Sequence, residues 1–188
     1  MIALYYRLTD LLERLGDWLM PTLARLVFAG VLFTYYWNSA TTKLGDGFFG
    51  LFNPSFGAYA QIFPKTMEAL GYDASLLGFH HWAIVVSGTI AEFVLPVLIV
   101  IGLATRPAAL AMIGFVVVQS LVDINGHGLA AADIGTWFDK NPSALIVDQR
   151  AFWVFTLGYL VLRGAGPISV DAIVRQSSRA FTSEPQPR

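Results

Sequence analysis

The 188-residue chain is 55% hydrophobic and only 13% charged, and its mean hydropathy is +0.58. A soluble domain carries about 25% charged residues, so this composition indicates an integral membrane protein. The net charge of -1 argues against a nucleic-acid partner, and the absence of cysteine excludes disulfides, thiol catalysis and iron–sulfur ligation. Redox chemistry would therefore need a bound cofactor, a bound quinone or a partner protein.

Residues 1–20 have the period of an amphipathic helix, with leucines on one side and charged residues on the other. The leucines stand at positions 4, 8, 11, 12, 15 and 19, and the charged residues are Arg7, Asp10, Glu13, Arg14 and Asp17. We expect this segment to lie on the membrane surface as a separate interfacial helix. Pro21 is expected to divide it from the first span.

Four apolar segments follow, at residues 22–44, 81–103, 106–124 and 150–163, and each is a candidate transmembrane helix. The sequence thus predicts an all-α fold, a four-helix membrane bundle that forms one domain over residues 22–172. The Phe-rich connection from Gly45 to Phe79 is expected to hold short interfacial helices around residues 55–70 that cap one end of the bundle. The polar segment 173–188 is predicted to be a disordered tail.

The basic residues outside the spans predict the orientation of the chain. Arginines predominate in the amino-terminal segment, the turn at Arg106 and the carboxy-terminal segment, so both termini are assigned to the cytoplasmic side of a bacterial inner membrane. The two longer connections, including the Phe-rich loop, would then face outward.

Glu92 lies near the middle of the second span, where a carboxylate is costly unless it is paired, protonated or turned toward a wet interior. The preferred hypothesis is a buried ion pair between Arg25 and Glu92 across the first two spans. Two alternatives are a neutral Glu92 that relays protons and a Glu92 that only hydrogen-bonds a neighbouring helix.

Polar residues from all four spans fall at the outward end of the predicted bundle. Asp123 and His127 are four residues apart and are expected to share a helix face, where they could exchange protons as a carboxylate–imidazole pair. Lys43, His81 and Arg150 are the candidate ligand-binding residues. The alternative is that these are ordinary interfacial residues near lipid headgroups.

Haem and metal sites are disfavoured by the histidine pattern. His80, His81 and His127 allow at most one haem with paired histidine ligands, and neither His80 nor His81 lies deep within its span. His81, Asp123 and His127 offer too few ligands for a closed metal site. No metal site is predicted.

Several motifs follow one another in a recognisable order. They are Arg25, Gly30, Phe33 and Lys43 in the first span, Glu92 in the second, the turn Gly102–Arg106, His127, and the closing motif Gly164–Asp171. In this arrangement the chain resembles the DoxX family of small four-helix membrane proteins over residues 22–172. That family is similar to the DoxD subunit of thiosulfate:quinone oxidoreductase.

The resemblance implies a redox-linked membrane subunit, which would at most be part of a quinone-linked oxidoreductase. In the leading hypothesis, a quinone or similar small apolar carrier binds at the outward end. Asp123 and His127 exchange protons there, and Lys43 or Arg150 stabilises a developing anion. The alternative is a non-enzymatic partner that recruits or stabilises a redox or stress-response assembly, and a small transporter is a third. The expected partners are membrane lipid and either another protein or a second copy.

Overall fold

The computed structural model describes residues 1–182, which form helices joined by turns and irregular connections and contain no strand. The helices are α1 (Ile2–Phe28), α2 (Thr34–Lys43), α3 (Phe56–Ile62), α4 (Pro64–Ala69), α5 (Phe79–Ile101), α6 (Thr105–Leu121), α7 (Ala131–Ile134), α8 (Arg150–Arg163) and α9 (Val170–Thr182). Three π-helical turns adjoin them, at Ala29–Phe33, Val122–Gly126 and Leu145–Gln149, and a 3₁₀ turn lies at Ala74–Leu76.

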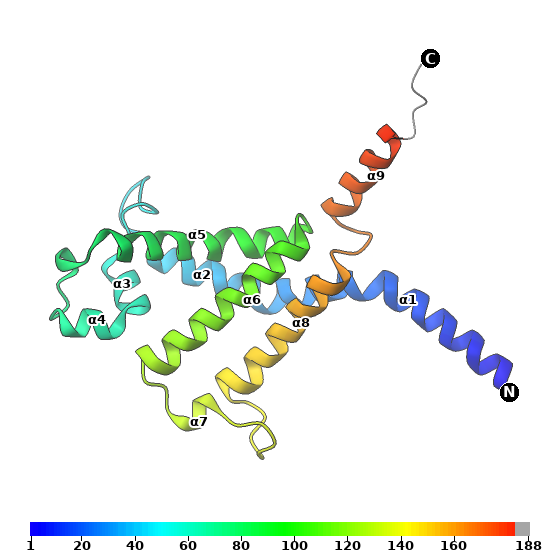
Figure 1. Ribbon diagram of the computed structural model, residues 1–188, viewed down its shortest axis with the longest axis horizontal. Helices are drawn as coiled ribbons and strands as arrows, with labels where there is room; N and C mark the ends of the chain where they lie inside the picture. The colour runs from blue at the N-terminus through cyan, green and yellow to red at the C-terminus, as the bar shows by residue number, and fades with distance from the viewer. Residues whose placement is uncertain (183–188) are drawn as a thin grey trace.

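Four helical stretches are long and apolar enough to cross a membrane: Ile2–Lys43, Phe79–Ile101, Thr105–Gly126 and Leu145–Arg163. Successive stretches run in opposite directions (Figure 1). The predicted all-α membrane bundle is therefore confirmed. We call the end where α2 finishes the Lys43 end, and the opposite end, where α5 finishes, the Arg25 end.

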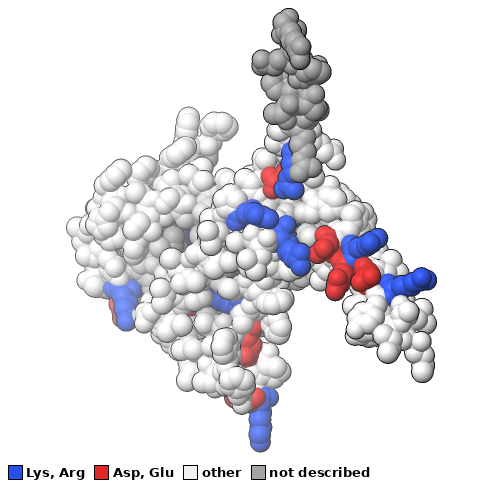
Figure 2. Space-filling model, turned by 45° about the vertical axis from the view of Figure 1, so that its right-hand side comes forward, with Lys and Arg blue, Asp and Glu red and all other residues white. Residues whose placement is uncertain are grey.

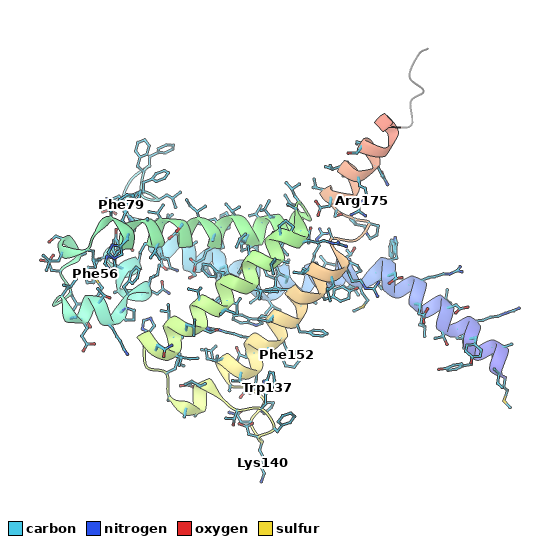
Figure 3. The ribbon with its side chains drawn as sticks, viewed as in Figure 1. Phe56, Phe79, Trp137, Lys140, Phe152 and Arg175 are labelled. Atoms are coloured by element: carbon cyan, nitrogen blue, oxygen red, sulfur yellow. The ribbon has the colours of Figure 1, made fainter. Side chains whose placement is uncertain are left out.

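The bundle core consists of apolar side chains that mostly recur every three or four residues along each helix. On the first helix these are Phe28, Leu32 and Tyr36, and α6 and α8 supply the opposing residues. The α6 and α8 residues are Ala108, Ala109, Met112, Val116, Leu157 and Leu160. Large apolar side chains such as Phe152 lie exposed on the outside (Figure 3), as expected where helices face lipid.

Pro21 does not divide the first helix, contrary to the prediction. One helix runs from Ile2 to Lys43, and its 42 residues correspond to about 63 Å, roughly twice the hydrocarbon thickness of a bilayer. Pro21 is buried inside it and lies against Gly166, where an added Cβ would come within 2.9 Å of the proline ring. The amino-terminal half of α1 extends beyond the bundle (Figure 1), and its leucines are exposed.

The short helices expected around residues 55–70 are present as α3 and α4. The tail expected from residue 173 is instead helical as far as Thr182, and residues 183–188 lie outside the described part of the chain. Ser169 explains how this helix starts, because its hydroxyl oxygen accepts a hydrogen bond from the backbone N–H of Ala172.

Arg25 holds the Arg25 end together. Its guanidinium donates to the carbonyl oxygens of Ile99 (3.0 Å) and Val100 (2.6 Å) in the last turn of α5, and to those of Ala165 (2.9 Å) and Ile168 (2.6 Å) in the closing motif. Helix ends leave carbonyl groups without helical partners, and the planar guanidinium satisfies several at once. This cation therefore connects three separate segments of the chain.

Asp171 of the closing motif caps the start of α6 from outside that helix. Its carboxylate accepts the backbone N–H groups of Ala104 (2.7 Å) and Thr105 (3.0 Å), and its own N–H donates to Gly102 (2.8 Å). Burial acts to raise the pKa of Asp171, but these N–H groups, together with the Thr105 side chain and the charge of Arg175, outweigh burial and the pKa is lowered. The resulting stabilisation is present above the ordinary Asp pKa and is lost as the pH falls through the lowered value.

We predict that Arg25→Lys destabilises the protein by about 3 kcal/mol or more, because one ammonium group cannot reach the four carbonyl oxygens that Arg25 binds in two segments of the chain. Thermal unfolding in mild detergent measures the effect. Arg7→Lys is the matched control, since Arg7 lies on the exposed part of the same helix and should leave the melting temperature unchanged. Equal melting temperatures for Arg25→Lys and the parent would contradict this role.

Candidate functional site

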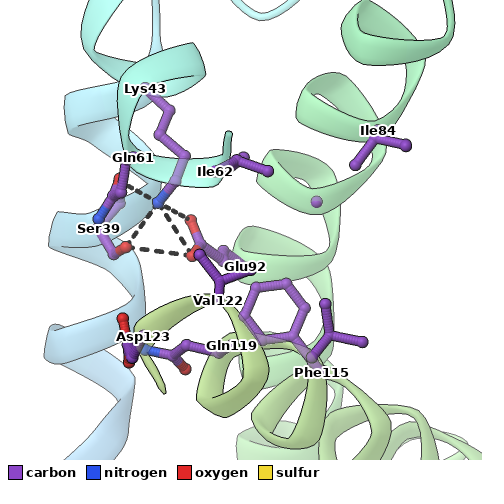
Figure 4. A pocket seen from close by; sticks show the side chains of 12 residues that line it. Ser39, Lys43, Gln61, Ile62, Ile84, Glu92, Phe115, Gln119, Val122 and Asp123 are labelled. Atoms are coloured by element: carbon purple, nitrogen blue, oxygen red, sulfur yellow. Dashed lines mark hydrogen bonds and ion pairs between the residues drawn. The ribbon is translucent and has the colours of Figure 1, made fainter. Parts of the chain in front are cut away.

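The deep carboxylate Glu92 forms an ion pair with Lys43 (Figure 4). The ammonium nitrogen lies 2.8 Å from one carboxylate oxygen and 3.0 Å from the other. Ser39 completes the cluster, because its hydroxyl donates to Glu92 at 3.1 Å and accepts from Lys43 at 2.7 Å. The Lys43 and Glu92 side chains are only 4% and 5% exposed, so each charge depends on the other.

The predicted pair between Arg25 and Glu92 is not formed. Arg25 binds the carbonyl of Ile99, which lies seven positions beyond Glu92 and therefore about 10 Å further along α5. Lys43 was predicted to lie at the mouth of the bundle and not to be the partner of Glu92. In the structure α2 ends beside the middle of α5, so its last residue reaches the deep carboxylate.

A small cavity of about 120 Å³ adjoins this cluster at the Lys43 end. Ser39, Lys43 and Glu92 provide its polar wall, and α3 covers it with Gln61 and Ile62. The remaining lining residues are Ile84 and Gly88 from α5, together with Phe115, Val118, Gln119, Val122 and Asp123. Figure 4 shows the ion pair and several of these apolar side chains around the same space. We call it the Lys43 cavity.

Gln119 links the Lys43 cavity to two tyrosines of the first helix. Its amide oxygen accepts from the hydroxyl of the fully buried Tyr36 at 3.3 Å, and its amide nitrogen donates to the Tyr35 hydroxyl at 2.7 Å. Tyr35 and Tyr36 both lie near the ring of Trp153, with centroids 5.7 Å and 6.5 Å away. The position of Gln119 is thus fixed from both sides of its amide group.

Asp123 pairs with Arg150 and not with His127. The Arg150 guanidinium donates to Asp123 and, at 2.7 Å, to the Ser120 hydroxyl. The Asp123–His127 pair was predicted for a regular α-helix, but Val122–Gly126 is a π-helical turn and His127 stands just past its end. The His127 ring nitrogen Nε2 instead lies 2.9 Å from the Gln61 carbonyl of α3.

The five predicted residues of the Lys43 end therefore do not form a single site. Lys43 and Asp123 line the Lys43 cavity. Arg150 and His127 do not line it, but Arg150 is hydrogen-bonded to the lining residue Asp123, and the His127 ring lies against the carbonyl of the lining residue Gln61. His81 packs against His80 and Phe63 outside the lining. Its Nδ1 is buried without a hydrogen-bond partner within the part of the chain that the structure describes.

The site predicted from the sequence did not include Ser39, Gln61, Gly88 or Gln119, although all four line this cavity. Ser39 carried a usable signal, because it lies one helical turn before Lys43 and so shares its face. Gln61 had none, since its place depends on how α3 folds back over the bundle. Among the described residues, no group of three or more His, Asp or Glu side chains is placed to hold a metal ion.

A bundle of apolar helices with a buried ion pair beside a cavity defines the chain as a polytopic helical membrane protein with a candidate small-molecule site. The DoxX family matches residues 20–122, which is more than half of the chain, so this protein belongs to the DoxX family. The matched region includes Arg25, Lys43 and Glu92, whereas the closing motif lies beyond it. No curated protein and no solved structure matches the chain.

We predict that Lys43 and Glu92 are energetically coupled. Lys43→Met and Glu92→Gln should each destabilise the protein by about 3–5 kcal/mol, because each leaves a buried group without its partner, and the double variant should lose less than the sum. Unfolding in detergent measures the cycle.

Arg25→Met combined with Glu92→Gln is the control cycle for this pair. Arg25 and Glu92 share no contact, so their losses should add to within about 0.5 kcal/mol. Additive losses in the Lys43–Glu92 cycle would show that this ion pair does not stabilise the fold.

Proposed function

We propose that this DoxX-family protein is a redox-linked membrane subunit that binds a quinone or a similar small apolar carrier in the Lys43 cavity. The observation that carries the proposal is a cavity with apolar walls and a buried lysine–carboxylate pair on one side. Ligand sites commonly combine apolar walls with a few fixed polar groups in this way.

The size of the cavity favours a single ring. Its volume of about 120 Å³ is close to the roughly 150 Å³ of an engineered cavity that admits benzene. Phe115 and Ile84 would contact the faces of such a ring, and a hydrophobic chain attached to it would leave toward lipid. A large polar metabolite fits this space poorly.

The polar wall suits the oxygens of a quinone. Lys43 already donates to Ser39 and Glu92, and a ring oxygen could replace one of these acceptors and be stabilised as it gains negative charge. Asp123 also lines the cavity and would exchange protons with the ligand. His127 would act indirectly, by holding the Gln61 carbonyl at the cover of the cavity.

Electrons would come from outside this chain. Reduction of a quinone to a quinol takes up an electron pair and a pair of protons. The cysteine-free chain has no thiol to supply electrons, so a reduced partner protein is the proposed donor. The protein then serves as the quinone-binding subunit of an assembly.

Filling the cavity tests the proposal. An added Cβ on Gly88 meets no atom within 4 Å, and Gly88 lines the cavity, so the side chain of Gly88→Leu is expected to fill part of it. We predict that this variant loses saturable binding of a short-chain benzoquinone, measured by quenching of tryptophan fluorescence in detergent.

Gly114→Leu is the matched control, because Gly114 also has open space around it and does not line the cavity. It should bind the benzoquinone as the parent does. Undiminished binding by a folded Gly88→Leu variant would place the ligand elsewhere, and a parent that does not bind would refute the proposal.

A second candidate is a non-enzymatic partner that recruits or stabilises a redox or stress-response assembly. The observation that favours it is the loop between α2 and α3, where Phe48, Phe49 and Phe52 are exposed. These side chains do not line the Lys43 cavity, which Gln61 and Ile62 of the same connection cover, and they are free to contact another membrane protein or lipid. A parent protein that binds no quinone but co-purifies with a specific membrane protein would favour this role.

We propose further that both termini face the cytoplasm of a bacterial inner membrane and that the Lys43 end faces outward. The distribution of arginines supports this orientation. Reporter fusions after residues 60, 105, 135 and 188 should read outside, inside, outside and inside. An outward carboxy terminus would reverse the orientation and place the cavity toward the cytoplasm.

A further inference from the structure

We propose that a cleft at the Arg25 end binds the phosphate-bearing headgroup of an anionic phospholipid. This inference does not depend on the proposed function, because the cleft lies at the opposite end of the bundle from the Lys43 cavity. It has a volume of about 550 Å³ and lies between α1, the end of α8 and the start of α9. Its charged and aromatic lining residues are Arg14, Asp17, Trp18, Arg163, Asp171 and Arg175, and we call it the arginine cleft.

The charges of the arginine cleft leave guanidinium groups available to an anion. Three arginines face two aspartates, which gives a net charge of +1. Asp171 uses both carboxylate oxygens to cap α6. Arg14 and Arg175 form no ion pair within the described residues. A phosphate bound here would meet several strong donors in the fork geometry that suits it.

The third arginine, Arg163, forms only a weak, exposed ion pair. Arg163 donates to Asp17 at 2.9 Å, but the two side chains are 58% and 65% exposed, and such surface pairs contribute little. A phosphate can therefore compete with Asp17 for Arg163. In Figure 2, blue and red side chains gather where α1 and α9 leave the bundle, while much of the rest of that face is white.

The depth of the arginine cleft matches the headgroup layer of a membrane. Arg163 is the last residue of the fourth candidate span, and Arg175 lies beyond it on α9 (Figure 3). Trp18, a residue type enriched at membrane interfaces, lines the cleft and is about half exposed. The apolar side chains of Ile168 and Ile173 are also exposed near this level.

A second hollow provides a path for an acyl chain, which favours a lipid over free phosphate. This hollow of about 420 Å³ is lined by Glu13, Gly16, Met20 and Tyr159, and it shares Asp17 and Arg163 with the arginine cleft. The two spaces therefore meet at the Asp17–Arg163 pair. A headgroup in the cleft could extend its glycerol and first methylenes between α1 and α8.

The test compares soluble short-chain lipids in thermal unfolding of the full chain in detergent. Dihexanoyl phosphatidylglycerol should raise the melting temperature of the parent more than dihexanoyl phosphatidylcholine or inorganic phosphate at the same concentration. Arg14→Gln combined with Arg175→Gln should weaken apparent phosphatidylglycerol binding by about tenfold or more, because two charged donors are lost.

The matched control is Arg7→Gln, which removes a charge from α1 outside the arginine cleft and should retain the phosphatidylglycerol response. Unfolding without lipid shows whether the double variant remains folded. An equal response to phosphatidylcholine, an equal response to inorganic phosphate, or an unchanged response of the double variant would each overturn the proposal.

Discussion

A cation buried inside a membrane bundle needs protein acceptors in place of water, and this requirement determines how the Arg25 end is built. Arg25 is 8% exposed and uses backbone carbonyls instead of a carboxylate. Those carbonyls come from the end of α5 and from the closing motif, so both segments must lie beside the first helix. The close approach of Arg25 also requires glycine at position 102. Gly102 adopts a positive φ of 73°, and a Cβ there would lie 2.9 Å from the guanidinium carbon.

The two ends of the bundle satisfy their buried cations in different ways. The carbonyl partners of Arg25 carry no formal charge and are fixed by the backbone, so the cluster cannot change its protonation. Lys43 instead faces a carboxylate, which can gain or lose a proton, and a hydroxyl, and a ligand can replace either of these acceptors. The first arrangement suits structural support, and the second suits a functional site.

Most of the fold was predictable, because it follows from hydrophobic length and from the order of motifs. The site was less predictable, for reasons that particular residues show. The Asp123–His127 prediction assumed regular α-helical spacing, which the π-helical turn after Leu121 breaks. The Arg25–Glu92 prediction treated side chains as the only partners and overlooked the free carbonyls at the end of α5. The position of α3 over the cavity depends on tertiary packing that periodicity does not encode.

The π-helical turn Ala29–Phe33 connects these two ends of the first helix. The buried residues of the first helix on either side of this turn, Phe28, Leu32, Tyr36 and Ala40, are each four positions apart. In a regular α-helix, the direction of the side chains in such a series rotates about the helix axis by roughly 40° per step. A π turn takes more residues per turn and offsets part of that drift. One face of the helix can therefore present Arg25 to the end of α5 and Lys43 to its middle. The structural cation and the cation of the candidate site are thus held in register by a single irregular turn.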